Sequence, residues 1–160
     1  MKLEAQFKSA DNRLYFLDGR EAALDSQKKC SPGNAVYEKD SVVFVDMPWE
    51  KVGMDEESYN EEFLAQMRDF LKKMEDDGAF AVIVPCAEKI PGTSAEKEDF
   101  VASMKHSARR IKDAKSVVGY AIPAYIDAQA FIEEFRPKHA HYIYFSSEDS
   151  VLADSSIVRI

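Results

Sequence analysis

Two short apolar runs with an amphipathic stretch between them constrain this chain more than any other feature. Residues 42–49 read VVFVDMPW and residues 79–85 read AFAVIVP, and both runs are rich in β-branched and aromatic side chains. Such runs are typical of strands buried on both faces of a parallel sheet. A crossover of the length between them returns the chain to the same sheet edge. The sequence therefore predicts a parallel strand–helix–strand unit over residues 41–85.

The predicted helix of this unit has one apolar stripe and a signal at each end. Ser58 and Glu61 fit a capping box, and Gly78 is placed to end the helix in the left-handed conformation. The apolar residues recur at helical spacing and form one stripe: Tyr59, Phe63, Leu64, Met67, Phe70, Leu71 and Met74. From this helix and the later ones we expect these residues to face the sheet: Phe63, Met67, Phe70, Leu71, Phe100, Met104, Ile111 and Phe131.

The C-terminal half repeats the same alternation of helix and strand. Thr93 and Glu96 fit a capping box before a second amphipathic helix, and Pro137 ends a short third one. Apolar runs at residues 116–123 and 141–145 predict two more strands, and residues 156–160 predict a short additional one. This order of elements argues for a parallel sheet with helices packed on it.

The N-terminal region has another pattern. Phe7, Leu14 and Phe16 sit in short alternating runs, and Asp18-Gly19 is a two-residue hairpin signal, so we expect antiparallel strands over residues 1–25. Residues 25–40 contain Ser, Pro, Gly, Asn and Lys in a cluster, which predicts a loop.

We therefore expect one α/β domain over residues 1–160, with an antiparallel hairpin region at 1–25 and βα units at 41–160. The parallel sheet would be either a half-barrel or an open, flavodoxin-like sheet.

Charge and composition exclude several classes of partner. The chain has 21 Lys and Arg against 29 Asp and Glu, a net charge of -8, so we expect no nucleic-acid partner. Apolar runs are too short to cross a membrane, so we expect no membrane partner. The start lacks the apolar core of a signal peptide, which indicates a cytoplasmic protein, or an extracellular one if a leader has been removed. Cys30 and Cys86 show no metal-ligand spacing, so we predict free thiols, with a single disulfide as the alternative. We expect no metal and no cofactor.

Several segments are similar, in order and spacing, to a known family. The segments are WEK at 49–51, FLKKMEDDG at 70–78, FAVIV at 80–84, VVGY at 117–120 and YFLDGR at 15–20. Together they resemble the N-terminal half of the cellulase-like (β/α)₈ barrels of glycoside hydrolase family 5, in clan A. A complete barrel of this type needs about 250 residues. The resemblance implies half of such a barrel and a function connected with carbohydrates.

The catalytic residues of that family are not matched here. Counted from residues 117–120, the family's Asn-Glu-Pro signature falls on residues 124–126, so Tyr125 stands where the acid/base glutamate would be. A phenol, with an ordinary pKa of about 10, is a poor substitute for that carboxyl group. The family's histidine and arginine would fall near Cys86 and Phe44, and its nucleophile belongs to a seventh strand. The resemblance therefore implies a domain without glycosidase activity.

If the strands are parallel, a ligand would bind at their C-terminal ends. Trp49 and Tyr125 could stack on a sugar there, with Asp127 beside them, although a lone Trp at a strand end more often covers a helix.

Asp46 with Glu88 or Glu148 could form a catalytic pair of carboxylates. Acidic residues at such places more often cap helices or face water.

The sequence also suggests two other kinds of site. His139 and His141 share the spacing of metal ligands on a strand, but without a third ligand they are more often surface residues. Cys86 follows a predicted strand, as a nucleophile does, although no His is placed beside it and a buried thiol is the plainer interpretation.

Three hypotheses from different classes follow. The first is a non-catalytic domain that binds a carbohydrate or a protein. The second is a glycoside hydrolase that uses relocated carboxylates or a site completed by another subunit. The third is a flavodoxin-like domain that binds an anion or a nucleotide at its helix N-termini. Because a half-barrel leaves sheet edges open, we also expect either a homodimer or edges covered by the hairpin and the C-terminal tail.

Overall fold

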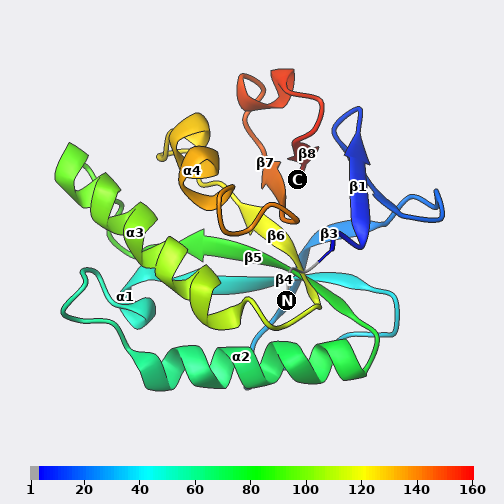
Figure 1. Cartoon of the computed structure of the whole chain (residues 1–160), viewed down its shortest axis with the longest axis horizontal. Helices are drawn as coiled ribbons and strands as arrows, with labels where there is room; N and C mark the ends of the chain where they lie inside the picture. Colours follow the sequence, from blue (N-terminus) through cyan, green and yellow to red (C-terminus); the bar gives the residue numbers. More distant parts are fainter. Residues whose placement is uncertain (1–3) are drawn as a thin grey trace.

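A computed structural model describes residues 4–160 as an α/β fold with a six-stranded parallel sheet curled into a half-barrel and a separate antiparallel hairpin (Figure 1). The strands are β1 (Phe7–Ala10), β2 (Arg13–Phe16), β3 (Leu24–Cys30), β4 (Val42–Pro48), β5 (Phe80–Cys86), β6 (Val117–Ala121), β7 (Ile143–Ser146) and β8 (Val158–Arg159). The helices are α1 (Trp49–Val52), α2 (Glu61–Asp76), α3 (Ser94–Ile111), α4 (Ala128–Phe135) and the 3₁₀ turn η1 (Val151–Ala153).

The sheet keeps the order of the chain, β3-β4-β5-β6-β7-β8, and every neighbouring pair is parallel. The parallel pairing predicted for the two apolar runs is confirmed, since Val42 pairs with Phe80 and Pro48 with Cys86 in one unbroken register. A flavodoxin-like sheet would change direction in its strand order and carry helices on both faces. The consecutive order therefore corrects the open-sheet alternative and confirms the half-barrel.

The outer face of the sheet forms the larger hydrophobic core. Side chains that alternate along β4 and β5, such as Val45 and Ile83, pack in one cluster with buried residues of all the longer helices. In Figure 1, α2, α3 and α4 lie around the sheet on the side away from β1. The helix residues expected to face the sheet do contribute to this cluster, either buried or packed against it: Phe63, Met67, Phe70, Leu71, Phe100, Met104, Ile111 and Phe131.

The inner face is covered by the hairpin instead of by helices. Phe7 and Leu14 are buried in a second cluster with Phe44, Val82 and other inward residues of the sheet. The Phe7 ring meets the ring of Phe80 edge-on, with centroids 4.8 Å apart. The hairpin thus fills the concave side of the sheet, which in a complete barrel would be the barrel interior.

The predicted hairpin is confirmed, but its main turn lies earlier than expected. Asp11 and Asn12 connect β1 to β2 with φ values of 52° and 62°, the left-handed pair that a two-residue hairpin turn requires. Asp18 and Gly19 do form a turn, closed by a 2.8 Å hydrogen bond from the Phe16 N–H to the Arg20 carbonyl.

Asn12 also ties the hairpin to the C-terminal segment. Its side-chain amide donates to the carbonyls of Leu152, Asp154 and Ile157 at 3.0, 3.0 and 2.7 Å. Its backbone carbonyl accepts from the N–H of Arg159 in β8 at 3.0 Å. The hairpin turn thus lies beside the β8 edge of the sheet.

The loop predicted at residues 25–40 is wrong in its first part. Leu24–Cys30 forms β3, which pairs with β4 through Lys29 opposite Phe44 and Cys30 opposite Val45. Asp25, Lys28 and Lys29 of this edge strand are solvent-exposed, and exposed edge strands carry charged side chains. Its polar sequence gave no local strand signal, and the strand forms by pairing with β4.

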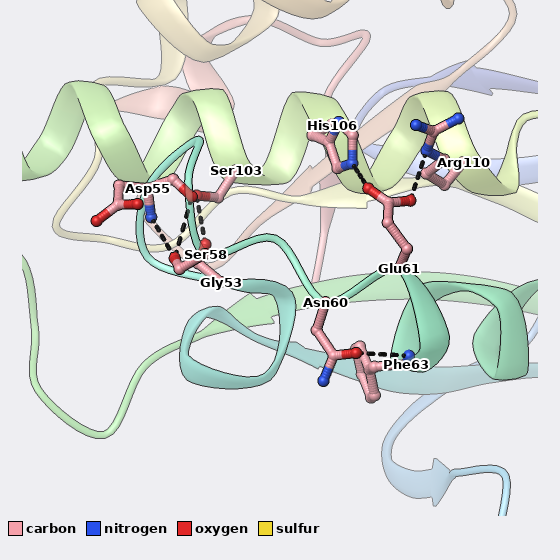
Figure 2. Close-up of polar contacts among 9 residues, drawn as sticks. All are labelled: Gly53, Asp55, Ser58, Asn60, Glu61, Phe63, Ser103, His106 and Arg110. Carbon is pink, nitrogen blue, oxygen red and sulfur yellow. Dashed lines mark hydrogen bonds and ion pairs between the residues drawn. The ribbon is translucent and has the colours of Figure 1, made fainter.

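The capping box predicted at Ser58 is also wrong. Asn60 caps α2, and its side chain accepts the N–H of Phe63 at 3.1 Å (Figure 2). The Ser58 hydroxyl instead exchanges hydrogen bonds with the backbone of Asp55 in the preceding turn, and Glu61 turns toward α3. Because the Ser58 hydroxyl already forms hydrogen bonds within this turn, it does not cap the helix. The helix therefore begins two residues later than predicted.

The other helix signals are confirmed. Thr93 and Glu96 form both hydrogen bonds of a capping box at the start of α3. Gly78 follows α2 with a φ of 75°. Within residues 4–160, no helix is long and apolar enough to cross a membrane.

Candidate functional site

The inner face becomes polar at the C-terminal ends of β4 and β5. Because side chains alternate along a strand, Asp46 shares the inner face with Phe44, and Cys86 shares it with Val82. Pro48 pairs with Cys86 at the last position of the register. This is the end of a parallel sheet where ligands bind in barrels and in open α/β sheets.

Lys29 brings a positive charge to this end from the edge strand. Its ammonium group lies 3.2 Å from the Asp46 carboxylate, and both side chains remain partly open to water. Such a half-exposed pair contributes little to stability, because water competes for both charges. Its groups are therefore free to exchange partners with a polar ligand.

The Cys86 thiol lies among these charges. Burial raises its pKa to about 11, the negative charges of Asp46 and Glu50 add to the increase, and Lys29 opposes it. A thiol with such a pKa stays protonated at neutral pH and is a poor nucleophile. Cys86 therefore acts as a small, neutral side chain, as the plainer interpretation of the sequence predicted.

Tyr125 reaches the same place from the loop after β6. Its ring packs edge-on against Phe100 with centroids 5.6 Å apart, and the side chain remains partly exposed. Burial raises its pKa to about 12, with smaller contributions from Cys86 and Glu50. The phenol is therefore neutral at physiological pH and offers a hydrogen-bond donor beside an apolar ring.

Glu50 completes the group from the first turn of α1. Its carboxylate accepts the backbone N–H of Glu88 at 3.1 Å, which connects the loops after β4 and β5. We call the five residues at this end of the sheet the polar rim: Lys29, Asp46, Glu50, Cys86 and Tyr125.

Trp49 and Asp127, which the sequence grouped with Tyr125, have structural contacts. Trp49 is 2% exposed, its ring packs on Phe100, and its indole N–H donates to the Ser103 hydroxyl at 3.2 Å. Asp127 is the N-cap of α4 and accepts the N–H of Ala130 at 2.9 Å. Tyr125 is the member of this trio that we include in the polar rim, because Cys86 and Glu50 influence the pKa of its hydroxyl group.

The two acids suggested as partners of Asp46 are exposed loop residues. Glu88 contributes its backbone N–H to Glu50, and Glu148 contributes its backbone N–H to the Ser146 hydroxyl at 3.1 Å. Glu50 is another carboxylate at this end of the sheet, and its charge, like that of Asp46, raises the pKa of the Cys86 thiol.

His139 and His141 surround an aromatic side chain. The His139 ring stacks on Tyr142 with centroids 5.0 Å apart, and the His141 ring lies 4.5 Å from Tyr142. Among the described residues, no group of three His, Cys, Asp or Glu side chains could hold a metal ion.

Sequence reasoning missed Lys29 and Glu50 as members of the site. Lys29 fell in the predicted loop, and its role depends on β3 pairing with β4. Glu50 directly follows the strand that ends in Pro48, a position at the C-terminal end of a parallel strand. That position was the signal that could have identified Glu50.

With the fold and the polar rim described, comparison with known proteins adds no assignment: the chain matches no model of a protein family and no curated protein.

Proposed function

We propose that this protein is a non-catalytic binding domain that holds a carbohydrate at the polar rim. One observation carries the proposal: side chains from β3, β4, α1, β5 and the loop after β6 converge at the C-terminal end of the half-barrel. A parallel sheet presents its ligand site at this end.

The chemistry of the polar rim suits a polyhydroxylated ligand. Asp46 and Glu50 offer carboxylate oxygens that accept hydrogen bonds from hydroxyl groups, and Lys29 offers a donor. Tyr125 adds a partly exposed aromatic ring, the kind of surface on which the apolar face of a sugar rests. Sugar recognition of this kind needs no proton transfer.

The same residues argue against hydrolysis. In the resemblance to family 5 enzymes, Tyr125 takes the position of the acid/base glutamate, and its pKa of about 12 keeps the phenol from donating a proton efficiently near neutral pH.

Binding can be tested by titrating gluco- and manno-oligosaccharides into the labelled protein while its amide NMR signals are recorded. We expect saturable shifts at Lys29, Glu50, Cys86 and Tyr125, and at least a tenfold loss of affinity in Tyr125→Ala. Tyr15→Ala, which removes a partly exposed ring on the hairpin, is the matched control and should bind normally.

The proposal fails if no sugar shifts the signals of the polar rim at millimolar concentration. Saturable shifts caused by a protein or peptide at the same residues would assign the site to the other partner class. Turnover of aryl β-glucosides, β-mannosides or soluble β-glucans that Asp46→Asn or Glu50→Gln abolishes would establish a hydrolase instead.

A further inference from the structure

A groove on the outer surface, away from the polar rim, runs between α3 and α4. It encloses about 830 Å³, and its apolar lining comes from both helices and the loop before α4. At one side the Tyr59 ring stacks on the His106 ring at a centroid distance of 4.1 Å. The apolar lining residues are Val101, Ala102, Ile126 and Ala130.

The two helical walls of the groove carry opposite net charges, although one acid, Glu98, also lines the groove from α3. Lys97, Lys105 and Arg109 line it from α3 at spacings of eight and four residues, which places them on one helix face. Glu133 and Glu134 line it from α4. A basic ridge therefore runs beside an acidic one.

Some charges around the groove are already paired within the chain. Lys105 binds Glu134 at 3.1 Å across the groove. Glu61 contacts both His106 and Arg110 at 2.6 and 2.8 Å, as Figure 2 shows.

Other charged residues along the two ridges remain available to a binding partner. Lys97, Arg109 and Glu133 form no ion pair with any other described residue. Glu133 accepts only a hydrogen bond from the neutral amide of Gln129, at 3.1 Å. Among the described residues, the surface therefore offers two basic residues without an ion pair on one ridge and one such acidic residue on the other.

We propose that this face is the interface of a homodimer in which α3 of one copy lies over α4 of the other. A two-fold axis along the groove exchanges the two ridges, so each basic ridge meets the partner's acidic ridge. A surface with both signs arranged in parallel is complementary to itself. An unrelated partner would have to reproduce the same pattern, whereas a second copy already has it.

The size of the surface predicts a weak dimer. At about 1.5 Å per residue, the 18 residues of α3 span roughly 27 Å. Two helices of which only one has this length supply an area at or below the roughly 800 Å² per partner of stable interfaces. Association should therefore be concentration-dependent and should weaken with added salt, because exposed charges contribute to it.

A charge-swap experiment tests the proposal directly. The first variant, Lys97→Glu with Arg109→Glu, makes both ridges acidic, and the second, Glu133→Lys with Glu134→Lys, makes both basic. The second variant loses the exposed Lys105 pair, which contributes little to the fold. Sedimentation velocity at low salt should show a wild-type dimer and at least a tenfold weaker association of each variant alone. An equimolar mixture of the two variants should associate again, because opposite ridges then meet.

The control reverses charges elsewhere. Lys8→Glu with Lys28→Glu changes the net charge as much as the first variant but alters exposed residues of β1 and β3, and it should dimerise like the wild type. A wild type that stays monomeric at millimolar concentration and low salt overturns the proposal. So does a mixture that associates no better than the separate variants. If a variant does not fold by circular dichroism, the salt dependence of the wild-type dimer decides, and a salt-independent dimer contradicts the interface.

Discussion

The two faces of the curled sheet are built from the same strands but have different covers. On the outer face, α2 and α3 have 16 and 18 residues, and Val45 and Ile83 beneath them are fully buried. On the inner face, the rings of the hairpin meet Phe80 at the start of β5, whereas Cys86 at its end lies among charges. Long helices cover the outer face and turn it into a hydrophobic core. The hairpin is short and covers only part of the inner face, so the C-terminal strand ends remain available to a ligand.

The largest effect should come from a change that damages both faces at once. A methyl group at Gly119 in β6 would overlap the Ile143 carbonyl of β7. Because backbone atoms cannot move aside cheaply, we expect Gly119→Ala to cost more than about 4 kcal/mol or to prevent folding. Urea unfolding measures this change. Gly33→Ala, with open space around the added methyl group, is the control and should stay close to the wild type.

The next prediction compares the two covers. Phe100→Ala in the outer core should lower the free energy of unfolding by about 3–5 kcal/mol, and Leu14→Ala under the hairpin by about 2–5 kcal/mol, because each leaves a cavity at a fully buried position. Leu17, which is 60% exposed, is the control, and Leu17→Ala should change little. A negligible effect of Leu14→Ala would mean that the hairpin is not part of the cooperative fold.

The third prediction concerns the pH dependence of the outer layer. Burial and, to a smaller extent, the charge of His141 lower the pKa of His139 from 6.5 to about 4. Between these two pH values the His139 imidazole binds a proton in the unfolded chain but stays neutral in the folded one. The free energy of unfolding therefore falls as the pH drops from about 6.5 to 4. Each pKa unit corresponds to about 1.4 kcal/mol.

Urea titrations of the wild type and of His139→Phe across this range measure that contribution. The variant should lose less stability than the wild type between pH 7 and pH 4.5, because its ring takes up no proton. Parallel losses in the two proteins would refute a buried, neutral His139.

The smallest effect distinguishes the two possible caps of α2. Asn60→Ala should cost about 1 kcal/mol, because it removes the acceptor of the Phe63 N–H. Ser58→Ala should cost less, since the Ser58 hydroxyl bonds only within the exposed turn at Asp55. Thermal unfolding of both variants measures the difference. The reverse order would restore the capping box suggested by the sequence.

Most of the regular elements were predictable because their signals are local. The runs at residues 42–49 and 79–85, the capping box of Thr93 and the turn residue Gly78 depend on neighbours a few positions away. The cap at Asn60 was missed because Ser58 and Asn60, two positions apart, could both serve as caps, and the hydrogen bond of Ser58 to Asp55 decided between them.

By itself, the sequence determined the alternation of strands and helices and the parallel pairing at its centre, because burial on both faces and helical periodicity are written in residue order. Only the tertiary structure decided that the polar segment at Lys29 is an edge strand, that the hairpin fills the inner face, and that Trp49 is buried while Tyr125 reaches the polar rim. These features depend on contacts between residues far apart in the chain. The physical reason is that the curvature of the sheet brings strand ends together. No pattern of neighbouring residues in the sequence indicates which side chains will meet there.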